Sequence, residues 1–395
     1  MSAGKYLQKY AEPEIRLLDT WPDSRYRHTL VIPSYRESPD FLQRLLEKFP
    51  TKKLLLILVV NQPDGDDNAN SNRELLQAIE KLSPPAWQNR HLSLRPWGEN
   101  GGLLLVERWR ETLRIPRKQG VGLARRIGCD IAAQLHQLGF LSSPWIHSTD
   151  ADTWLPEDYF EGLPDAQITS AALYPFAHDS GHSPVHQALQ LYEQALHYYV
   201  ENLRRAGSPW AFHTIGSILA ISVHHYCAAR GFPKKAAGED FYLLNKLGKL
   251  APVVELTDRA PVRIAARLSD RVPFGTGPAT AKIAGQLESG EEPTWYAPQV
   301  FDELRDFLNE ALEDGGQVCQ NPRWREALEE LGWQQFTNHC RQQKLLGAAR
   351  ENAFHHWFDA FRTLRFIHLM QRRWHPPRPL RELLAQTTSV SQGTL

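Results

Sequence analysis

The sequence lacks several features that would assign it to a specialised class of protein. It has no apolar run approaching the ~20 residues of a membrane-spanning helix; the longest are Leu54–Val60 and the region 215–223. Its 4 cysteines are far apart and form no Cys-x-x-Cys pair, which argues for a reducing compartment and against structural zinc or a disulfide framework. Met1–Trp21 has no signal-peptide core. These absences lead us to expect a cytoplasmic protein.

The chain also lacks an excess of charge of either sign. Lys+Arg and Asp+Glu each number 45, so there is no basic field suited to nucleic acid. We therefore expect no nucleic-acid partner.

What is present is an alternation of strand-like and helix-like segments. The apolar or β-branched runs are residues 29–32, 54–60, 92–94 and 145–147, and helical patterns cover 39–49, 72–82 and 120–138. This alternation predicts an α/β fold with a mostly parallel sheet. From about Pro298 to Trp374 the chain is almost entirely helix-forming. We predict an N-terminal extension (1–25), an α/β domain (26–290), an all-α C-terminal domain (291–385) and a flexible tail (386–395).

The most informative motif is Asp150-Ala151-Asp152, which follows the predicted strand 145–147. Taken alone, such a motif is more often a loop with an Asx turn. However, 33–37, 61–66 and 150–152 all follow predicted strands, and ligands bind at the carboxyl ends of the strands in such sheets. Paired carboxylates suit Mg²⁺ or Mn²⁺ holding a diphosphate. The pattern is typical of a nucleotide pocket.

These motifs, in this order, resemble those of the family 2 glycosyltransferases, inverting enzymes with the GT-A fold that use nucleotide-sugar donors. The resemblance covers roughly residues 26–260. Five segments carry it: Val31-Ile32-Pro33-Ser34-Tyr35-Arg36-Glu37, the Gly-rich Ala-Arg stretch 119–128, Asp150-Ala151-Asp152, Gly216-Ser217, and Gly231-Phe232-Pro233 leading into Gly238-Glu239-Asp240.

The resemblance implies a role for each matching position. Asp152 and Asp150 would hold the divalent metal, and Asp240 would be the general base that deprotonates the acceptor hydroxyl. Asn61 stands where the family usually offers an aspartate to the nucleobase, with Asp64 and Asp66 as substitutes. The residues expected to bind the donor are Pro33, Tyr35, Glu37, Asn61, Lys118, Gly120, Arg125, Ala151 and Arg271.

Two further assignments keep an alternative. Trp210, His213 and Glu239 are expected to bind the acceptor, although an aromatic core cluster explains Trp210 equally well. Residues 269–277, with Arg271, are interpreted either as a loop closing over the donor or as an ordinary linker rich in turn residues.

The sequence therefore predicts a metal-dependent hexosyltransferase with a nucleoside-diphosphate sugar donor and a small-molecule or lipid-linked hydroxyl acceptor. The alternatives are a non-catalytic nucleotide-sugar-binding protein and a sugar nucleotidyltransferase. An apolar stripe over residues 354–367 is interpreted as a packing face against the rest of the chain or a second subunit. The same stripe is also compatible with peripheral membrane contact or with homo-oligomer formation.

Overall fold

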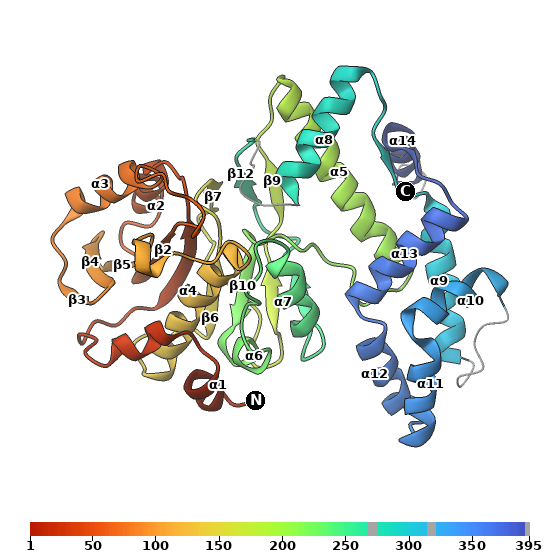
Figure 1. Ribbon diagram of the computed structural model, residues 1–395, viewed down its shortest axis with the longest axis horizontal. Helices are drawn as coiled ribbons and strands as arrows, with labels where there is room; N and C mark the ends of the chain where they lie inside the picture. Colours follow the sequence, from red (N-terminus) through yellow and green to blue (C-terminus); the bar gives the residue numbers. More distant parts are fainter. Residues whose placement is uncertain (268–274, 314–320, 392–395) are drawn as a thin grey trace. The chain divides into compact units, whose positions relative to one another are not determined.

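The computed structural model describes residues 1–267, 275–313 and 321–391, and the chain divides into two units (Figure 1). Unit 1 is Met1–Asp179 with Thr214–Pro278, and unit 2 is Ser180–His213 with Ala279–Leu395. This division differs from the sequence-based domains in three respects. Residues 1–25 belong to unit 1, and residues 180–213 and 279–290 belong to the helical unit 2.

A large mixed sheet forms the centre of unit 1, with strand order β11-β8-β10-β6-β1-β2-β5-β4-β3. Its bounds are β1 His28–Ser34, β2 Leu54–Asn61, β3 Trp87–Asn89, β4 Leu92–Trp97, β5 Gly101–Arg108, β6 Trp145–Ser148, β8 Ala171–Leu173, β10 Leu219–Ser222 and β11 Val253–Glu255. The four strands β6, β1, β2 and β5 are parallel, whereas β10, β4 and β3 pair antiparallel with their neighbours. The predicted α/β class is confirmed, and the parallel pairing is concentrated in the centre of the sheet.

The apolar runs of the sequence form the central strands, and helices cover them. Every residue of β1 and β2 is buried, as expected for parallel strands packed on both faces. The helices of unit 1 are α1 Ala3–Lys9, α2 Asp40–Lys48, α3 Arg73–Leu82, α4 Gly120–Gln137, α6 Val223–Ala228 and α7 Glu239–Leu247. At Gly128 of α4 a Cβ atom would lie too close to Val31 and Val59, so only glycine allows this helix to pack this closely against the sheet.

A second, three-stranded sheet in unit 1 holds the segment after Asp152 in place. It has the order β7-β12-β9, with bounds Thr153–Trp154, Val262–Ile264 and Phe176–His178. Arg263 pairs with Trp154 and Ile264 with Thr153 across β7 and β12, and the Ala265 amide donates to the Asp152 carbonyl at 2.9 Å. Residues 265–267 therefore lie beside the Asp-x-Asp motif.

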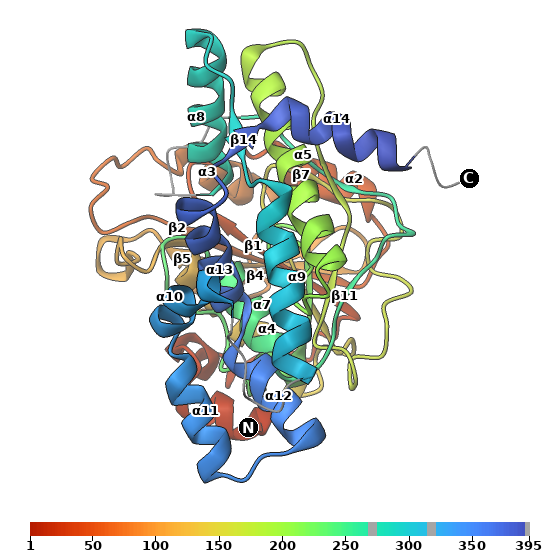
Figure 2. The ribbon, with the colours of Figure 1, turned by 90° about the vertical axis from the view of Figure 1, so that its right-hand side faces the viewer.

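Unit 2 is helical, with one short strand pairing between β13 (Thr294–Trp295) and β14 (Arg378–Pro379). Its helices are α5 Pro184–Arg205, α8 Thr276–Ser289 (which begins at the end of unit 1), α9 Pro298–Glu313, α10 Pro322–Leu331, α11 Trp333–Gln342, α12 Gly347–Trp357, α13 Ala360–Arg373 and α14 Leu380–Ser391 (Figure 2). Its core is aromatic: Phe307 packs against Trp324, Phe358 and Phe366. Phe354 and Phe358 of the predicted apolar stripe are buried in this core. This part of the stripe packs within unit 2.

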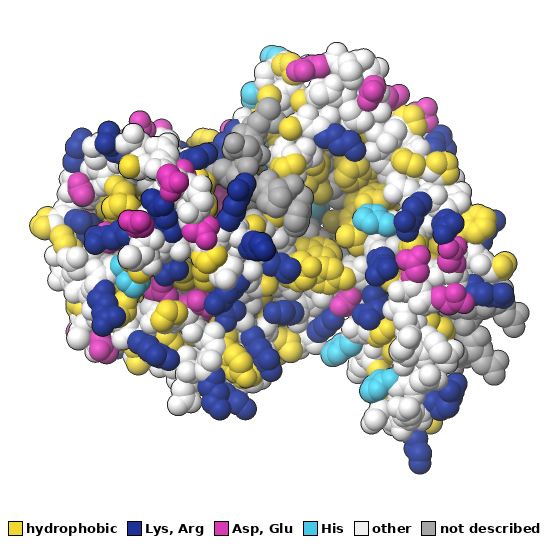
Figure 3. All heavy atoms as spheres, in the orientation of Figure 1, with side chains coloured by type: hydrophobic (Ala, Val, Ile, Leu, Met, Phe, Trp, Pro, Cys, Tyr) yellow, Lys and Arg dark blue, Asp and Glu magenta, His cyan; other side chains and the backbone are white. Residues whose placement is uncertain are grey.

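Among the described residues, no helix is long and apolar enough to cross a membrane. Basic and acidic side chains are interspersed on the face of unit 1 seen in Figure 3, in keeping with the balanced composition. The predicted tail 386–395 falls partly in α14, which continues to Ser391, and residues 392–395 lie outside the described part.

Candidate functional site

The Asp-x-Asp motif lies in a braced turn directly after β6. The Thr149 hydroxyl donates to the Ser217 carbonyl at 2.7 Å, and the Thr153 hydroxyl donates to the Asp150 carbonyl at 2.8 Å. Arg44 donates to the carbonyl of the buried Ala151 at 2.9 Å. These bonds hold the backbone on both sides of the two carboxylates, so their positions are fixed by the fold.

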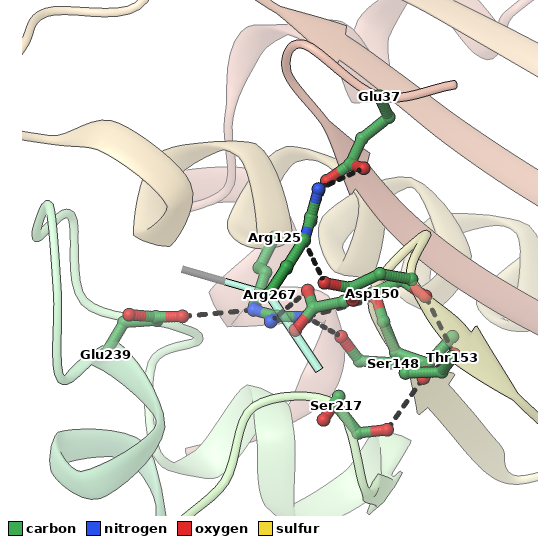
Figure 4. A network of polar contacts seen from close by, with 10 residues as sticks. Glu37, Arg125, Ser148, Asp150, Thr153, Ser217, Glu239 and Arg267 are labelled. Carbon is green, nitrogen blue, oxygen red and sulfur yellow. Dashed lines mark hydrogen bonds and ion pairs between the residues drawn. The ribbon is translucent and has the colours of Figure 1, made fainter. Parts of the chain in front are cut away.

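Arg125, from α4, joins the motif to the Glu-Asp segment (Figure 4). Its guanidinium donates to Asp150 Oδ1 at 2.7 Å, to Glu239 Oε1 at 3.0 Å and to Ser148 Oγ at 2.9 Å. The side chain is 3% exposed. The resemblance implied that Arg125 would bind the donor. Its described contacts are those of an internal cation that holds two carboxylates.

Glu239 and Asp240 begin α7 next to this cation. Burial raises the pKa of Glu239, and the ion pair with Arg125 opposes that rise. Burial, followed by the negative charge of Glu239, raises the pKa of Asp240 to about 7. Asp240 Oδ1 also accepts the Phe241 amide at 2.7 Å. A carboxylate that titrates near neutral pH is suited to accept a proton from a substrate.

A second arginine, Arg267, lies between Asp152 and Glu37. Figure 4 shows its pairing with Glu37. Its Nε donates to Asp152 Oδ2 at 2.7 Å, and its two terminal nitrogens donate to the Glu37 carboxylate at 2.7 and 3.0 Å. This fork-shaped pairing is the geometry in which arginine binds carboxylates most strongly. The side chain is 33% exposed, so solvent reaches the arginine.

Sequence reasoning did not select Arg267 as a site residue, although the recurrence of Arg263, Arg267 and Arg271 at intervals of four residues beside the loop 269–277 is visible in the sequence. Arg267 lies 115 residues from Asp152 and 230 residues from Glu37 in the sequence. Pairing over such separations has no local sequence pattern that would predict it. Arg271 itself, expected to bind the donor, lies outside the described residues.

At the ends of β1 and β2, Tyr35, Arg36 and Asp66 form a polar cluster. The Tyr35 hydroxyl donates to Asp66 Oδ2 at 2.8 Å, and Arg36 lies 3.5 Å from Asp66 Oδ1. Burial opposes ionisation of Asp66, but hydrogen bonds from Ser71 and Tyr35 lower its pKa below the usual range. Pro33 and Asn61 are buried at the ends of their strands.

The glycines before α4 serve close packing within the chain. Gly120 has a φ of 40°, and a Cβ there would lie 2.7 Å from Ala236 Cα. The Gly122 amide donates to the Lys235 carbonyl at 3.0 Å. Segment 233–236, which leads to Glu239, thus approaches the backbone closely at these two glycines. Lys118 is exposed ahead of the helix.

Of the expected acceptor residues, Glu239 belongs to unit 1, whereas Trp210 and His213 belong to unit 2. Trp210 is buried, and its indole N–H donates to the Phe358 carbonyl at 3.0 Å. His213 packs edge-to-face on His197 with ring centroids 4.8 Å apart. The contacts of Trp210 agree with the alternative interpretation of an aromatic core residue.

The described residues contain no group of three or more His, Cys, Asp or Glu side chains arranged to hold a metal. Asp150 and Asp152 each have one oxygen bonded to an arginine. Magnesium sites are often built from one or two protein carboxylates and completed by substrate phosphates and water. The two aspartates fit such a partial site, in which Arg267 and a cation would compete for Asp152.

Comparison with protein-family models and with curated proteins gave no match. The geometry and charges of the site are therefore the basis for assigning a function.

Proposed function

We propose that this protein is a cytoplasmic, nucleotide-sugar-dependent glycosyltransferase of the GT-A type. It would transfer a hexose from a nucleoside diphosphate to a hydroxyl group of a small-molecule or lipid-linked acceptor. The observation that carries the proposal is the convergence of Asp150, Glu239 and Arg125, from three separate elements, beside an Asp240 whose pKa is raised to about 7.

Each residue has a separate task in the proposed reaction. Asp240 accepts the proton of the acceptor hydroxyl as that oxygen attacks the anomeric carbon and the sugar–phosphate bond breaks. Glu239 and Arg125 hold the first turn of α7 against the Asp-x-Asp turn, so the base keeps a fixed position relative to the donor. Asp66 and Tyr35 offer polar groups to the nucleoside from the ends of β1 and β2.

The leaving diphosphate requires positive charge. A divalent cation held by Asp152 and Asp150 would supply charge stabilisation of that group. Arg267 bonds to Asp152 and lies partly in solvent. It is the side chain best placed to exchange its carboxylate partners for phosphate oxygens.

A second candidate function, a non-catalytic nucleotide-sugar-binding protein, has one observation in its favour. Arg267 bonds to both Asp152 and Glu37, so two of the expected ligand-binding carboxylates have an internal partner. Such a protein would bind a nucleotide sugar without turning it over. The two candidates therefore differ in product formation and not in binding.

The test is release of nucleoside diphosphate from UDP-, GDP-, CDP- and dTDP-hexoses in the presence of Mn²⁺ and a panel of hydroxyl acceptors. The proposal expects release from one donor class, reduced about a hundred- to ten-thousand-fold in Asp240→Asn. Asp258→Asn, an exposed carboxylate of the same unit, is the matched control and should retain activity. Equal release by wild type and Asp240→Asn would remove the proposed base. Binding without release would favour the non-catalytic candidate.

A further inference from the structure

A cavity of about 530 Å³ opens in unit 1 at the amino ends of β1 and β2. Its lining comes from residues 27–28, 51–53 and 160–162. The residues discussed for the donor follow the carboxyl ends of these same strands, so the cavity lies at the opposite edge of the sheet. Its volume is within the range of about 300–1,000 Å³ typical of small-molecule pockets.

The cavity contains a buried imidazole. His28 is 7% exposed, packs on Phe160 with ring centroids 5.0 Å apart, and lines the cavity. Its Nδ1 has no hydrogen-bond partner within the described part of the chain. This nitrogen is shielded from solvent. A buried polar atom without a partner is costly, and a ligand offsets that cost where the ring turns to present the nitrogen to the cavity.

The rim of the cavity is basic. Arg27, Lys52 and Lys53 line it together with one acid, Glu161. Lys52 donates to Glu161, while no ion pair engages Arg27 or Lys53 among the residues that the structure describes. Two cations are thus available beside an imidazole and an aromatic ring. Guanidinium and ammonium groups bind phosphate through charge-assisted hydrogen bonds.

We propose that this cavity is a second ligand site, which binds a small organic phosphate. Arg27 and Lys53 hold the phosphate group, His28 hydrogen-bonds to the ligand, and Phe160 packs against its organic part. The volume exceeds what a lone phosphate group needs, which favours a phosphate ester over the free ion. The site is independent of the glycosyltransferase proposal, since none of its residues belongs to the carboxylate cluster.

The test is calorimetric titration of the full chain with glucose 6-phosphate and, separately, inorganic phosphate. Histidine-selective NMR locates the contact. Burial, then the positive charges of Arg27 and Lys52, lower the pKa of His28 to about 4, and a bound phosphate should raise it. We expect saturable binding of the ester, tighter than that of the free ion, with a shift of the His28 resonance. Equal affinity for both would overturn the assignment to an organic phosphate.

Charge variants make the test specific. Arg27→Gln with Lys53→Gln removes two exposed cations and should weaken binding tenfold or more, by the ~1.5–3 kcal/mol scale of bonds to charged groups. Glu161→Gln removes the rim carboxylate and should tighten binding. Lys9→Gln with Lys81→Gln, exposed lysines elsewhere in unit 1, changes net charge equally and should leave affinity unchanged. No saturable binding, or equal weakening by the control, would overturn the site.

Discussion

Arg267 Nε donates to Asp152 Oδ2 at 2.7 Å, and the other two nitrogens of the same guanidinium donate to the Glu37 carboxylate. The arginine therefore bonds to the carboxylate of Asp152, which the resemblance implies as a metal ligand. This relationship, together with the Arg125 bridge from Asp150 to Glu239, gives each acid of the Asp-x-Asp motif its own internal cation. Several measurable properties depend on it.

The first prediction concerns competition for Asp152. Arg267→Gln should bind Mn²⁺ more tightly than wild type, by up to about fivefold, because a part-exposed ion pair contributes up to about 1 kcal/mol. Metal affinity is measured from the electron paramagnetic resonance signal of free Mn²⁺. Arg263→Gln, which removes a more exposed arginine from the neighbouring strand, is the control and should bind as wild type does. Unchanged or weaker affinity in Arg267→Gln would show that the arginine does not compete with metal.

The second prediction concerns the stability contributed by Arg125. Arg125→Met leaves the buried Glu239 carboxylate without its cation, and should lower the free energy of unfolding by about 3–5 kcal/mol. Adding Glu239→Gln to that variant should recover part of the loss, since the uncompensated charge is then gone. Urea unfolding of both variants and of Arg110→Gln, an exposed control, measures the effect. Additive losses in the double variant would contradict the coupling.

The third prediction follows from the raised pKa of Asp240. In the unfolded chain an aspartate titrates near 4, whereas in the folded protein its pKa is about 7. The folded state therefore binds the extra proton between these values, and this group's contribution to stability falls as pH rises from about 4 to about 7. Asp240→Asn should thus gain stability relative to wild type across that window, with no further gain above it.

Thermal or urea unfolding from pH 4 to pH 8 measures this difference. Asp258→Asn should show no such trend, because its side chain is exposed. Parallel stability curves for wild type and Asp240→Asn would contradict a raised pKa at Asp240. The same pKa predicts that the transfer rate of wild type rises with pH through about 7, since the base must lose its proton to act.

The fourth prediction tests how the N-terminal segment is joined to unit 1. The Tyr6 and Tyr226 hydroxyls donate to Asp130 Oδ1 at 2.6 and 2.7 Å, and burial raises the pKa of Asp130 to about 6. Tyr6→Phe removes one bond to a buried carboxyl group and should cost about 1–3 kcal/mol of stability. Tyr10→Phe, at a residue 40% exposed, should cost much less. Equal effects in urea unfolding would show that the Tyr6–Asp130 bond does not hold the segment.

Much of the central sheet could be predicted because its signals are local. The apolar run Leu54–Val60 matches β2, and the apolar spacing over 120–138 matches α4, since burial on the sheet imposes those patterns. Residues 101–108 form β5, which the sequence analysis did not select although its apolar residues are contiguous. The apolar region 215–223 is a strand only at Leu219–Ser222, and α6 begins at Val223.

Long-range pairing limited the prediction of the site. The Asp-x-Asp and Glu-Asp motifs are readable because their residues are adjacent in sequence. Arg125 was expected to bind the donor, and only the structure shows that it pairs with Glu239 and Asp150, which lie 114 and 25 residues away in the sequence. Likewise, α5 has an amphipathic pattern that fits either unit. Its side chains Ala188 and Tyr192 pack with Ile283 and Ala284 of α8, a grouping that one sequence does not specify.

The most direct test of the account is the melting temperature with UDP, GDP, CDP and dTDP, each with and without Mn²⁺, in wild type and in Asp152→Asn. A ligand that binds only the folded state stabilises it by mass action, by about 2.7 kcal/mol at a hundred times its Kd. We predict that one nucleoside diphosphate raises the melting temperature of wild type only when Mn²⁺ is present, and that Asp152→Asn loses this rise. No rise with any of the four, or a full rise in Asp152→Asn, would contradict a metal-assisted diphosphate site at the Asp-x-Asp motif.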